Sequence, residues 1–246
     1  MKEPDAAQFR PESVGLFLDV DGTLIEFAPT PGSVVVPPAL LEELASLENR
    51  LGGALALVSG RQIVDLDALF APLNLRASGV HGSEIRFEPG GAVARLASAQ
   101  LGDEIWNDLQ HVIARFPGSF SENKGYSFAV HYRFANASAS EFCRALRDFV
   151  RQIPTPPLEV VAGHFVYEIK LAGIDKGSAI ERFMMRNPFA GRTPIFIGDD
   201  RIDQPGFDKV TALGGVAYSV GAELLGVAGW FSRPTAVRAW LERLGR

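Results

Sequence analysis

The sequence predicts an α/β protein with a mainly parallel sheet, interrupted by an inserted α+β block. Short apolar runs alternate with segments of helical periodicity in residues 1–84 and again in 171–246, as in sheets whose parallel strands are joined by helices. Between these segments, residues 85–170 show hairpins and alternating side chains, which are typical of antiparallel structure. We therefore expect a discontinuous core domain, 1–84 and 171–246, and an inserted domain, 85–170.

The first core segment contains three expected strands. Leucines recur at intervals of one to four residues between 40 and 51, and Gly52-Gly53 then ends the helix. In chain order, the pattern predicts a strand at 14–18, a loop at 28–32, a helix at 40–51, a strand at 54–58, a helix at 63–70 and a strand at 77–80.

The inserted block shows the antiparallel pattern, and the last segment returns to alternating strands and helices. Proline and glycine at 89–91 mark the turn of a first hairpin, and Gly163 marks the turn of a second. The block is expected to contain strands at 84–87, 93–96, 127–133, 158–161 and 164–171, with helices around 101–116 and 138–152. After it, we expect a helix following 175–177, a strand at 194–197 and a last helix after 232–234.

Composition limits the classes of function. The chain has 246 residues, 47% of them hydrophobic, and a formal net charge of -5, which argues against a nucleic-acid partner because such partners need a concentrated basic face. Cys143 is the sole cysteine, so no intrachain disulfide can form. The N-terminus does not resemble a signal peptide, and the weakly polar stretch 214–231 is too short to span a bilayer. We expect a soluble, cytoplasmic protein with no membrane partner; the oligomeric state stays open.

Residues 19–24, DVDGTL, place two carboxylates where a buried strand opens into a turn. Residues i and i+2 of a strand share one face, about 6.6 Å apart, so Asp19 and Asp21 can converge on one small group. One carboxylate can attack phosphorus and carry an acyl phosphate, while the other protonates the leaving oxygen and later activates water. The competing interpretation is an ordinary turn rich in Asp and Gly. The apolar strand before the motif and the Thr-Leu after it favour phosphoryl chemistry.

Two further polar clusters, 59–61 and 199–203, also follow apolar strands. Ligands of parallel sheets bind beyond the carboxyl ends of the strands, so we expect all three clusters to converge. Acids from two strand ends can share one divalent cation, and carboxylate oxygens suit Mg²⁺. Ser59 can donate a hydrogen bond to a phosphate oxygen. Either of these two clusters can alternatively be an ordinary helix cap.

The DVDGTL segment resembles the first signature of the haloacid dehalogenase superfamily phosphatases. The resemblance implies a Rossmann-like core, with Asp19 as the nucleophile and Asp21 as the acid/base. Lys176 matches the third signature of that superfamily, where a lysine balances the repulsion of the acids and stabilises charge on the phosphoryl oxygens. A lone lysine at the start of a helix is usually solvated, so this role rests on the resemblance.

The same resemblance implies a magnesium site. Asp199 matches the first acid of the last signature and is the implied metal ligand. Asp19 and the backbone carbonyl of Asp21 complete the implied ligand set, and Asp200 and Asp203 are assigned to its outer shell.

Further motifs resemble those of the trehalose-6-phosphate phosphatases over nearly the whole chain, from Val14 to about Leu244. They occur in the family's order, at 58–61 (VSGR), 79–82 (GVHG), 122–125 (ENKG), 131–133 (HYR), 168–170 (EIK) and 198–200 (GDD). The resemblance implies a cap inserted after the second motif and hydrolysis of trehalose 6-phosphate, with a synthase of that ester as the pathway link. The boundaries expected for the insertion agree with this layout.

Sugar recognition is assigned to the cap. Glu122, Lys124 and Glu168 match the family's sugar-binding positions, although a solvated charged sheet face is the simpler explanation from the residues alone. The carboxylates can accept hydrogen bonds from hydroxyls, and the lysine can donate. With Ser59 and Gly60, the substrate-binding set includes Arg61, expected to reach the substrate, and His81, expected at the cap hinge; either can instead be structural.

The last motif departs from the family pattern. The family usually follows Gly-Asp-Asp with any residue and then Thr-Asp-Glu, whereas this chain has Ile202 and Gln204 at two of these positions. The changes remove a hydroxyl and a negative charge near the expected metal, which can weaken its outer shell. These changes motivate one alternative, a weakly catalytic sugar-phosphate sensor. A second alternative, a capped phosphatase that acts on another sugar phosphate, also stays open.

Overall fold

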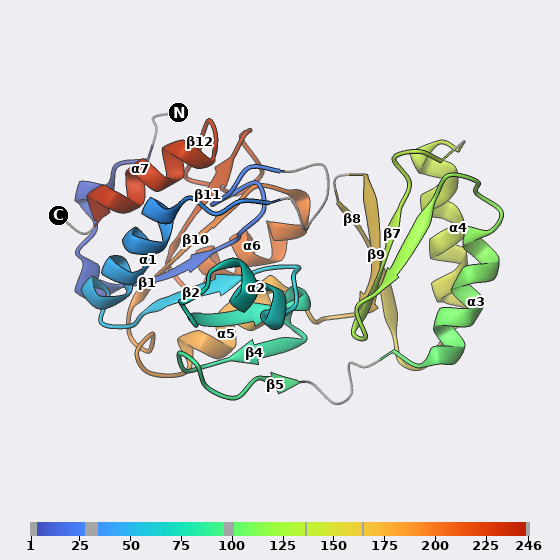
Figure 1. Cartoon of the computed structure of the whole chain (residues 1–246), viewed down its shortest axis with the longest axis horizontal. Helices are drawn as coiled ribbons and strands as arrows, with labels where there is room; N and C mark the ends of the chain where they lie inside the picture. Colours follow the sequence, from blue (N-terminus) through green and yellow to red (C-terminus); the bar gives the residue numbers. More distant parts are fainter. Residues whose placement is uncertain (1–3, 28–33, 96–100, 136, 164, 245–246) are drawn as a thin grey trace. The chain divides into compact units, whose positions relative to one another are not determined.

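The computed structural model describes residues 4–27, 34–95, 101–135, 137–163 and 165–244 (Figure 1). The chain forms two compact units, of which the first comprises Met1–Ala94 and Asp175–Arg246 and the second Arg95–Ile174. The loop expected at 28–32 lies outside the described residues. So do Leu96 and His164, each at one end of an expected strand.

The first unit is built on an eight-stranded sheet with the order β12-β11-β10-β1-β2-β3-β4-β5. The strands from β12 to β3 are parallel, and β4 joins β3 in antiparallel fashion. The α/β class with a parallel sheet is therefore confirmed. In chain order the strands are β1 (Val14–Leu18), β2 (Leu55–Val58), β3 (Arg76–Gly79), β4 (Glu84–Arg86), β5 (Ala94–Arg95), β10 (Thr193–Gly198), β11 (Val216–Val220) and β12 (Gly229–Phe231).

The first hairpin belongs to this sheet and not to the inserted unit. We expected residues 85–94 in the insertion because their pattern is antiparallel. In the structure β4 pairs with β3, with Ser78 opposite Ile85, and β5 lies beside β4 at the edge of the same sheet. The sequence pattern indicates that β4 is antiparallel, which the structure confirms, but such a pattern does not indicate which sheet a strand joins.

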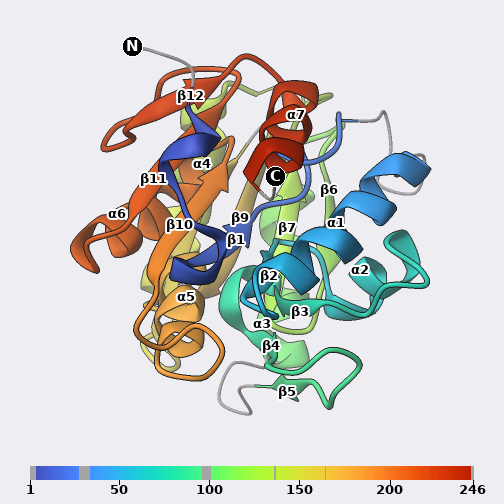
Figure 2. The same cartoon turned by 90° about the vertical axis from the view of Figure 1, so that its left-hand side faces the viewer.

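Helices cover both faces of the first sheet. Figure 2 shows α1 and α7 on one side and α5 and α6 on the other. Strand β1 lies between them and is buried at every residue, and its Phe17 stacks on Phe189 at 5.0 Å. Burying one such side chain contributes about 2 to 3 kcal/mol. The helices are α1 (Pro38–Arg50), α2 (Ile63–Leu69), α5 (Lys176–Met184), α6 (Gln204–Ala212) and α7 (Pro234–Leu244).

The second unit is a four-stranded antiparallel sheet with the order β6-β7-β9-β8 and two helices on one of its faces (Figure 1). Tyr167, Ile169 and Leu171 of β9 pack with the helices in a separate hydrophobic core, so Glu168 and Lys170 lie on the opposite face. The elements are α3 (Asp103–Ile113), β6 (Phe120–Asn123), β7 (Ser127–His131), α4 (Ala139–Arg151), β8 (Leu158–Gly163) and β9 (Val166–Leu171).

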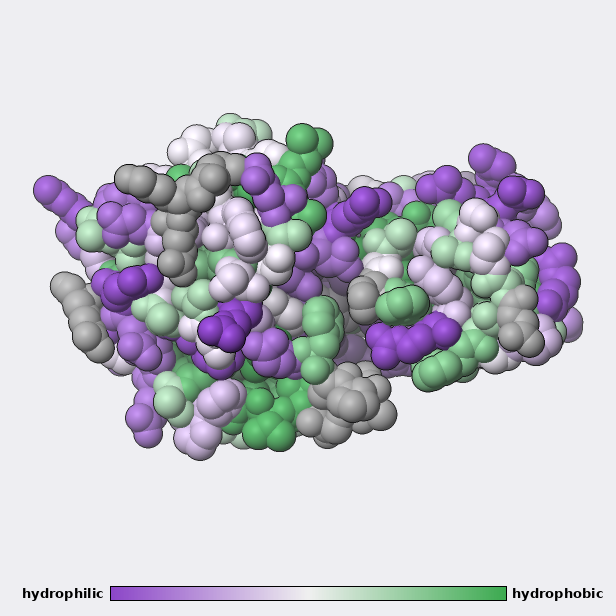
Figure 3. All heavy atoms as spheres, turned by 90° about the horizontal axis from the view of Figure 1, so that it is seen from above, coloured by the Kyte–Doolittle hydropathy of each residue, from purple (hydrophilic) through white to green (hydrophobic). Residues whose placement is uncertain are grey.

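Within the described ranges, no helix is long and apolar enough to cross a membrane. Figure 3 shows hydrophobic residues in separate patches among hydrophilic ones on the face that it displays.

Candidate active site

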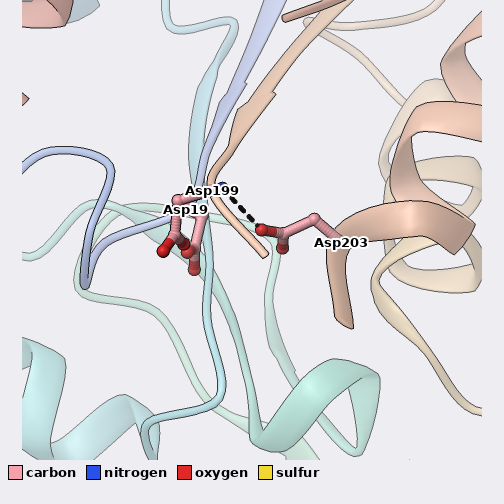
Figure 4. A group of neighbouring side chains, drawn as sticks. All are labelled: Asp19, Asp199 and Asp203. Carbon is pink, nitrogen blue, oxygen red and sulfur yellow. Dashed lines mark hydrogen bonds between the residues drawn. The ribbon is translucent and has the colours of Figure 1, made fainter. Parts of the chain in front are cut away.

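Three carboxylates meet at the carboxyl ends of two adjacent strands. Asp19 follows β1, Asp199 follows β10, and Asp203 ends the 3-10 helix Arg201–Asp203 (Figure 4). One oxygen from each of the three lies within 4.8 Å of the others. The expected convergence of the first and third polar clusters is therefore present.

Strand register and one glycine bring Asp19 and Asp199 together. Leu18 pairs with Ile197, and the backbone N–H of Asp19 donates to the carbonyl of Ile197 at 2.9 Å. The segments that follow β1 and β10 therefore leave the sheet side by side. Gly22 has a φ of +77°, and a Cβ at this position would lie 2.2 Å from Oδ2 of Asp199. Only glycine allows the turn after β1 to pack this closely against the second acid.

Lys176 links two of the acids. It is the first residue of α5, and the helix start is fixed by Asp175, whose side chain accepts from the N–H of Ser178 at 2.7 Å. The Lys176 ammonium lies 2.7 Å from Oδ1 of Asp19 and 2.5 Å from Oδ1 of Asp203. With 3% of its surface exposed, this lysine is not the solvated helix residue that its position alone would suggest.

Asp203 is held by the backbone as well as by the lysine. Its Oδ2 accepts from the N–H groups of Asp199 and Asp200 at 2.8 and 3.0 Å, and the residue is 1% exposed. Asp203 thus orients the turn that carries Asp199. Asp200 points elsewhere and caps the following 3-10 helix by accepting from the N–H of Arg201 at 2.6 Å.

Burial and mutual repulsion raise the pKa values of the two acids at the strand ends. Burial raises the pKa of Asp19 to about 7, with Lys176 opposing this and Asp203 adding to it. Burial, and then the charge of Asp19, raises the pKa of Asp199 to about 9. Burial alone would lower the pKa of Lys176, but Asp19 and Asp203 outweigh it and raise it. If all three acids were ionised, their negative charge would exceed what the Lys176 ammonium balances.

This excess charge is what a divalent cation would relieve. The three acids offer hard carboxylate oxygens, which are ligands that Mg²⁺ prefers. The residues present therefore fit the expected metal.

Asp21 lies apart from this cluster and pairs with Arg61. Nε and Nη2 of Arg61 donate to the two carboxylate oxygens of Asp21, both at 2.6 Å. The hydrogen bond from Arg61 to Asp21 is also the main cause of the raised pKa of the guanidinium. The side chain of Asp21 is 28% exposed, whereas that of Asp19 is 7% exposed. The second polar cluster thus meets the first motif through this pair, which the sequence did not predict.

Ser59, Gly60 and His81 form one packed group beyond β2 and β3. Oγ of Ser59 accepts from the N–H of Arg61 at 3.1 Å, and the carbonyl of Ser59 accepts from the N–H of His81. A Cβ on Gly60 would lie 2.6 Å from the ring of His81, so this glycine leaves room for the imidazole. His81 is 6% exposed with a φ of 51°, a buried position inside the first unit.

The three residues expected to bind sugar gather on the second unit. Nζ of Lys124 lies 2.6 Å from Oε1 of Glu168, which is 3% exposed. Glu122 and Glu168 lie opposite the same residue of β7, Ala129, and therefore share one sheet face. The structure also places His131 there, with its Nε2 3.9 Å from Oε2 of Glu122. His131 was quoted within a motif but given no role.

Comparisons with known proteins identify the family of the chain. A trehalose-phosphatase family model matches residues 17–224. The chain belongs to the trehalose-phosphatase family. It is 41% identical to the trehalose-6-phosphate phosphatase of Escherichia coli K12 over 93% of this chain and 85% of that protein. It is 40% identical to a probable trehalose-phosphate phosphatase of Sinorhizobium fredii over 84% of this chain and 77% of that protein.

The fold of the trehalose-phosphatase family is also seen in solved structures. A trehalose-6-phosphate phosphatase related protein superposes with a TM-score of 0.75 over 94% of this chain and 96% of its own, at 23% identity. The C-terminal domain of a trehalose-6-phosphate phosphatase from C. albicans gives a TM-score of 0.76 over 95% and 92%, at 19% identity. At these identities the likeness shows the fold alone.

Gln204, one of the two departures from the family pattern, does not face the acids. Its amide nitrogen donates to Oδ1 of Asp208 at 2.8 Å and to the carbonyl of Leu225 at 3.1 Å. It thus ties the start of α6 to the segment between β11 and β12. A glutamate could not donate these bonds, so the missing charge has a local structural reason and no longer supports the sensor interpretation.

Replacing Gln204 by glutamate is therefore expected to destabilise the first unit. Two like charges four residues apart on α6 would repel, and the Leu225 carbonyl would lose its donor, at a cost of about 1 kcal/mol. For a protein of this size the melting temperature should fall by about 2 to 4 °C. Differential scanning calorimetry would measure the fall in melting temperature. The neutral variant Gln204→Met is the control, because it loses the same hydrogen bonds without adding a charge. An unchanged or higher melting temperature for Gln204→Glu would contradict the stabilising role of these hydrogen bonds.

Proposed function

We propose that the chain hydrolyses trehalose 6-phosphate to trehalose and phosphate through a phosphoaspartate on Asp19. The observation that carries the proposal is the buried carboxylate of Asp19, held by Lys176 beside Asp199 at the carboxyl end of the sheet. The choice of trehalose 6-phosphate is supported by the printed activity of the Escherichia coli relative at 41% identity.

Asp19 is the nucleophile in this proposal. Lys176 holds Oδ1 of Asp19, and the carboxylate attacks phosphorus and forms the acyl phosphate as the P–O bond to the sugar breaks. The same ammonium lies where charge builds on the phosphoryl oxygens and stabilises it. Because both Asp19 and Lys176 are almost fully buried, these interactions act with little screening by water.

Asp21 is the acid/base. It protonates the departing sugar oxygen, and in the second half-reaction it removes a proton from the water that attacks the phosphoaspartate. Both of its oxygens contact Arg61, so it must exchange at least one contact before it can transfer a proton. The substrate offers the exchange partner, because phosphate accepts the bidentate guanidinium as well as a carboxylate does. Ser59 can donate to the same phosphate.

Asp19, Asp199 and the backbone carbonyl of Asp21 would hold Mg²⁺, with Asp200 and Asp203 behind them. When bound, the metal would offset charge on the phosphoryl group and orient it. The raised pKa values of Asp19 and Asp199 support this assignment.

The second unit would select the sugar. Glu122, Lys124 and Glu168 can exchange their mutual contacts for hydrogen bonds to hydroxyls. A poor substrate would leave these groups without partners, which is how polar sites reject analogues strongly. The synthase of trehalose 6-phosphate would supply the ester, and a cytoplasmic location would suit this exchange.

Phosphate release from a panel of esters tests the proposal. The panel comprises trehalose 6-phosphate, sucrose 6-phosphate, glucose 6-phosphate and an aryl phosphate, each with Mg²⁺ and with EDTA. Trehalose 6-phosphate should be preferred by at least about 10²-fold in kcat/KM, and only with metal. Preference for another sugar phosphate, or release from the aryl ester alone, would keep the Asp19 chemistry and overturn the substrate. Tight binding of trehalose 6-phosphate by calorimetry without release would overturn the activity and favour a sensor.

A further inference from the structure

The second sheet carries two neighbouring rows of side chains on the face opposite its helices. Glu122, Ala129 and Glu168 lie directly across from one another on β6, β7 and β9 and form the first row. Phe120 and His131 lie across from one another two residues away on β6 and β7 and form the second. Residues two apart on a strand share a face, about 6.6 Å apart, so the second row adjoins the carboxylates.

The second row is a stacked aromatic pair. The rings of Phe120 and His131 are 4.4 Å apart between centroids and inclined by only 14°. Phe120 nevertheless remains 55% exposed, so its ring is supported on one side by the imidazole and presents apolar surface on the other. A phenyl ring held in this way loses little conformational freedom when a ligand settles on it.

His131 connects the pair to the carboxylates. Its Nε2 lies 3.9 Å from Oε2 of Glu122, and the nearby imidazole is the main cause of the lowered pKa of that carboxyl. Lys124 and Glu168 continue the polar row with their contact of 2.6 Å. One face therefore combines an exposed aromatic ring with carboxyl acceptors and a lysine donor.

That combination matches the chemistry of a pyranose ring. A sugar presents C–H groups on its faces and hydroxyls around its edge, so a site that holds it needs an apolar plane with polar groups beside it. We propose that Phe120, positioned by His131, is the surface on which a glucose ring of the substrate stacks while Glu122, Lys124 and Glu168 bind its hydroxyls. This inference rests on the proposed hydrolysis of trehalose 6-phosphate.

Removing the ring tests the inference. The ratio of kcat/KM for trehalose 6-phosphate to that for an aryl phosphate should fall about tenfold in Phe120→Ala, because an aromatic stacking contact is lost. Phe120→Leu, which keeps apolar bulk without a ring, should show most of this loss, and Phe120→Trp should retain the ratio. The matched control is Phe134→Ala, which removes a ring that is 73% exposed in the same unit and should leave the ratio unchanged.

Two variants of His131 separate positioning from polarity. His131→Phe keeps a ring beneath Phe120 and loses the contact to Glu122, so the ratio should stay close to that of the parent protein; in His131→Ala it should fall. An equal loss in both variants would overturn the positioning role, and an unchanged ratio in Phe120→Ala would overturn the stacking surface. If the parent protein releases phosphate from the aryl ester but not from trehalose 6-phosphate, the proposed function fails first and the inference falls with it.

Discussion

Replacing Asp19 by asparagine is expected to reduce phosphate release from trehalose 6-phosphate by at least about 10⁴-fold, the scale of effect seen when a covalent nucleophile is removed. Asparagine has the same shape but cannot form an acyl phosphate. The fold should persist, because Lys176 keeps Asp203 as its partner at 2.5 Å and one buried carboxylate is removed from beside Asp199. The melting temperature of the metal-free variant should equal or exceed that of the parent protein.

Steady-state phosphate release and acid-quenched labelling would both be measured. Labelled phosphate should remain on the quenched parent protein and not on Asp19→Asn. Asp148→Asn is a matched control, since its side chain is 54% exposed and pairs with Arg151 on the surface of α4. Activity of Asp19→Asn within tenfold of this control would refute the nucleophile, even if the substrate assignment survived.

Replacing Lys176 by methionine is expected to cause the largest loss of stability. Methionine fills similar space, but Asp19 and Asp203, which are 5% and 1% exposed, would lose the ammonium that both contact. Breaking a buried charge network in this way costs about 3 to 5 kcal/mol. At about 2 to 4 °C per kcal/mol, the first unit should melt roughly 10 °C lower. Catalysis should also be lost.

The loss should depend on pH with a defined sign. The folded-state pKa of Asp19 is already raised to about 7, so the native protein binds its proton more tightly than the unfolded chain does. The stability that comes from this proton is present below pH 4 and declines as the pH rises towards 7. Without Lys176, the free energy of unfolding should fall more as the pH rises. The stability lost in Lys176→Met, relative to the parent protein, should therefore be greater at pH 8 than at pH 5.

Denaturant unfolding at the two pH values would measure this deficit. Lys209→Met is the matched control. Lys209, like Lys176, pairs with a carboxylate, that of Glu181 at 2.9 Å, but both side chains of this pair are at least 30% exposed. Such a pair contributes at most about 1 kcal/mol. If Lys176→Met lost no more stability than Lys209→Met, the buried network would not have the role assigned to it.

The sequence was sufficient to predict strands that are buried on both faces of the sheet. Strand β1 occupies residues 14–18 as expected, since five consecutive apolar residues in a parallel sheet need no alternation. The acids after β1 and β10 could be placed together because parallel strands end at the same edge. The start of α5 at Lys176 also followed from the local motif.

Three strands and one side-chain pair were not predicted from the sequence. Strand β6 has the sequence FSEN, whose residues are exposed or half-buried, so hydrophobic patterning could not reveal it or the ring pair that it forms with His131. Strands β11 and β12 lie within the stretch 214–231, for which only a membrane span was considered. The Asp21–Arg61 pair depends on how two turns approach each other in space, which no local pattern encodes.

The order of strands in the first sheet has a consequence for biosynthesis. Val14 of β1 pairs with Thr193 of β10, and the whole second unit, Arg95–Ile174, is synthesised between them. Such distant pairing forms slowly because a long loop must close first, whereas the second unit has a hydrophobic core of its own. On the ribosome, the inserted unit can therefore fold while Asp19 still has neither Asp199 nor Lys176 beside it. A partly synthesised chain would have no phosphatase centre, and activity would arise only at the last stage of folding.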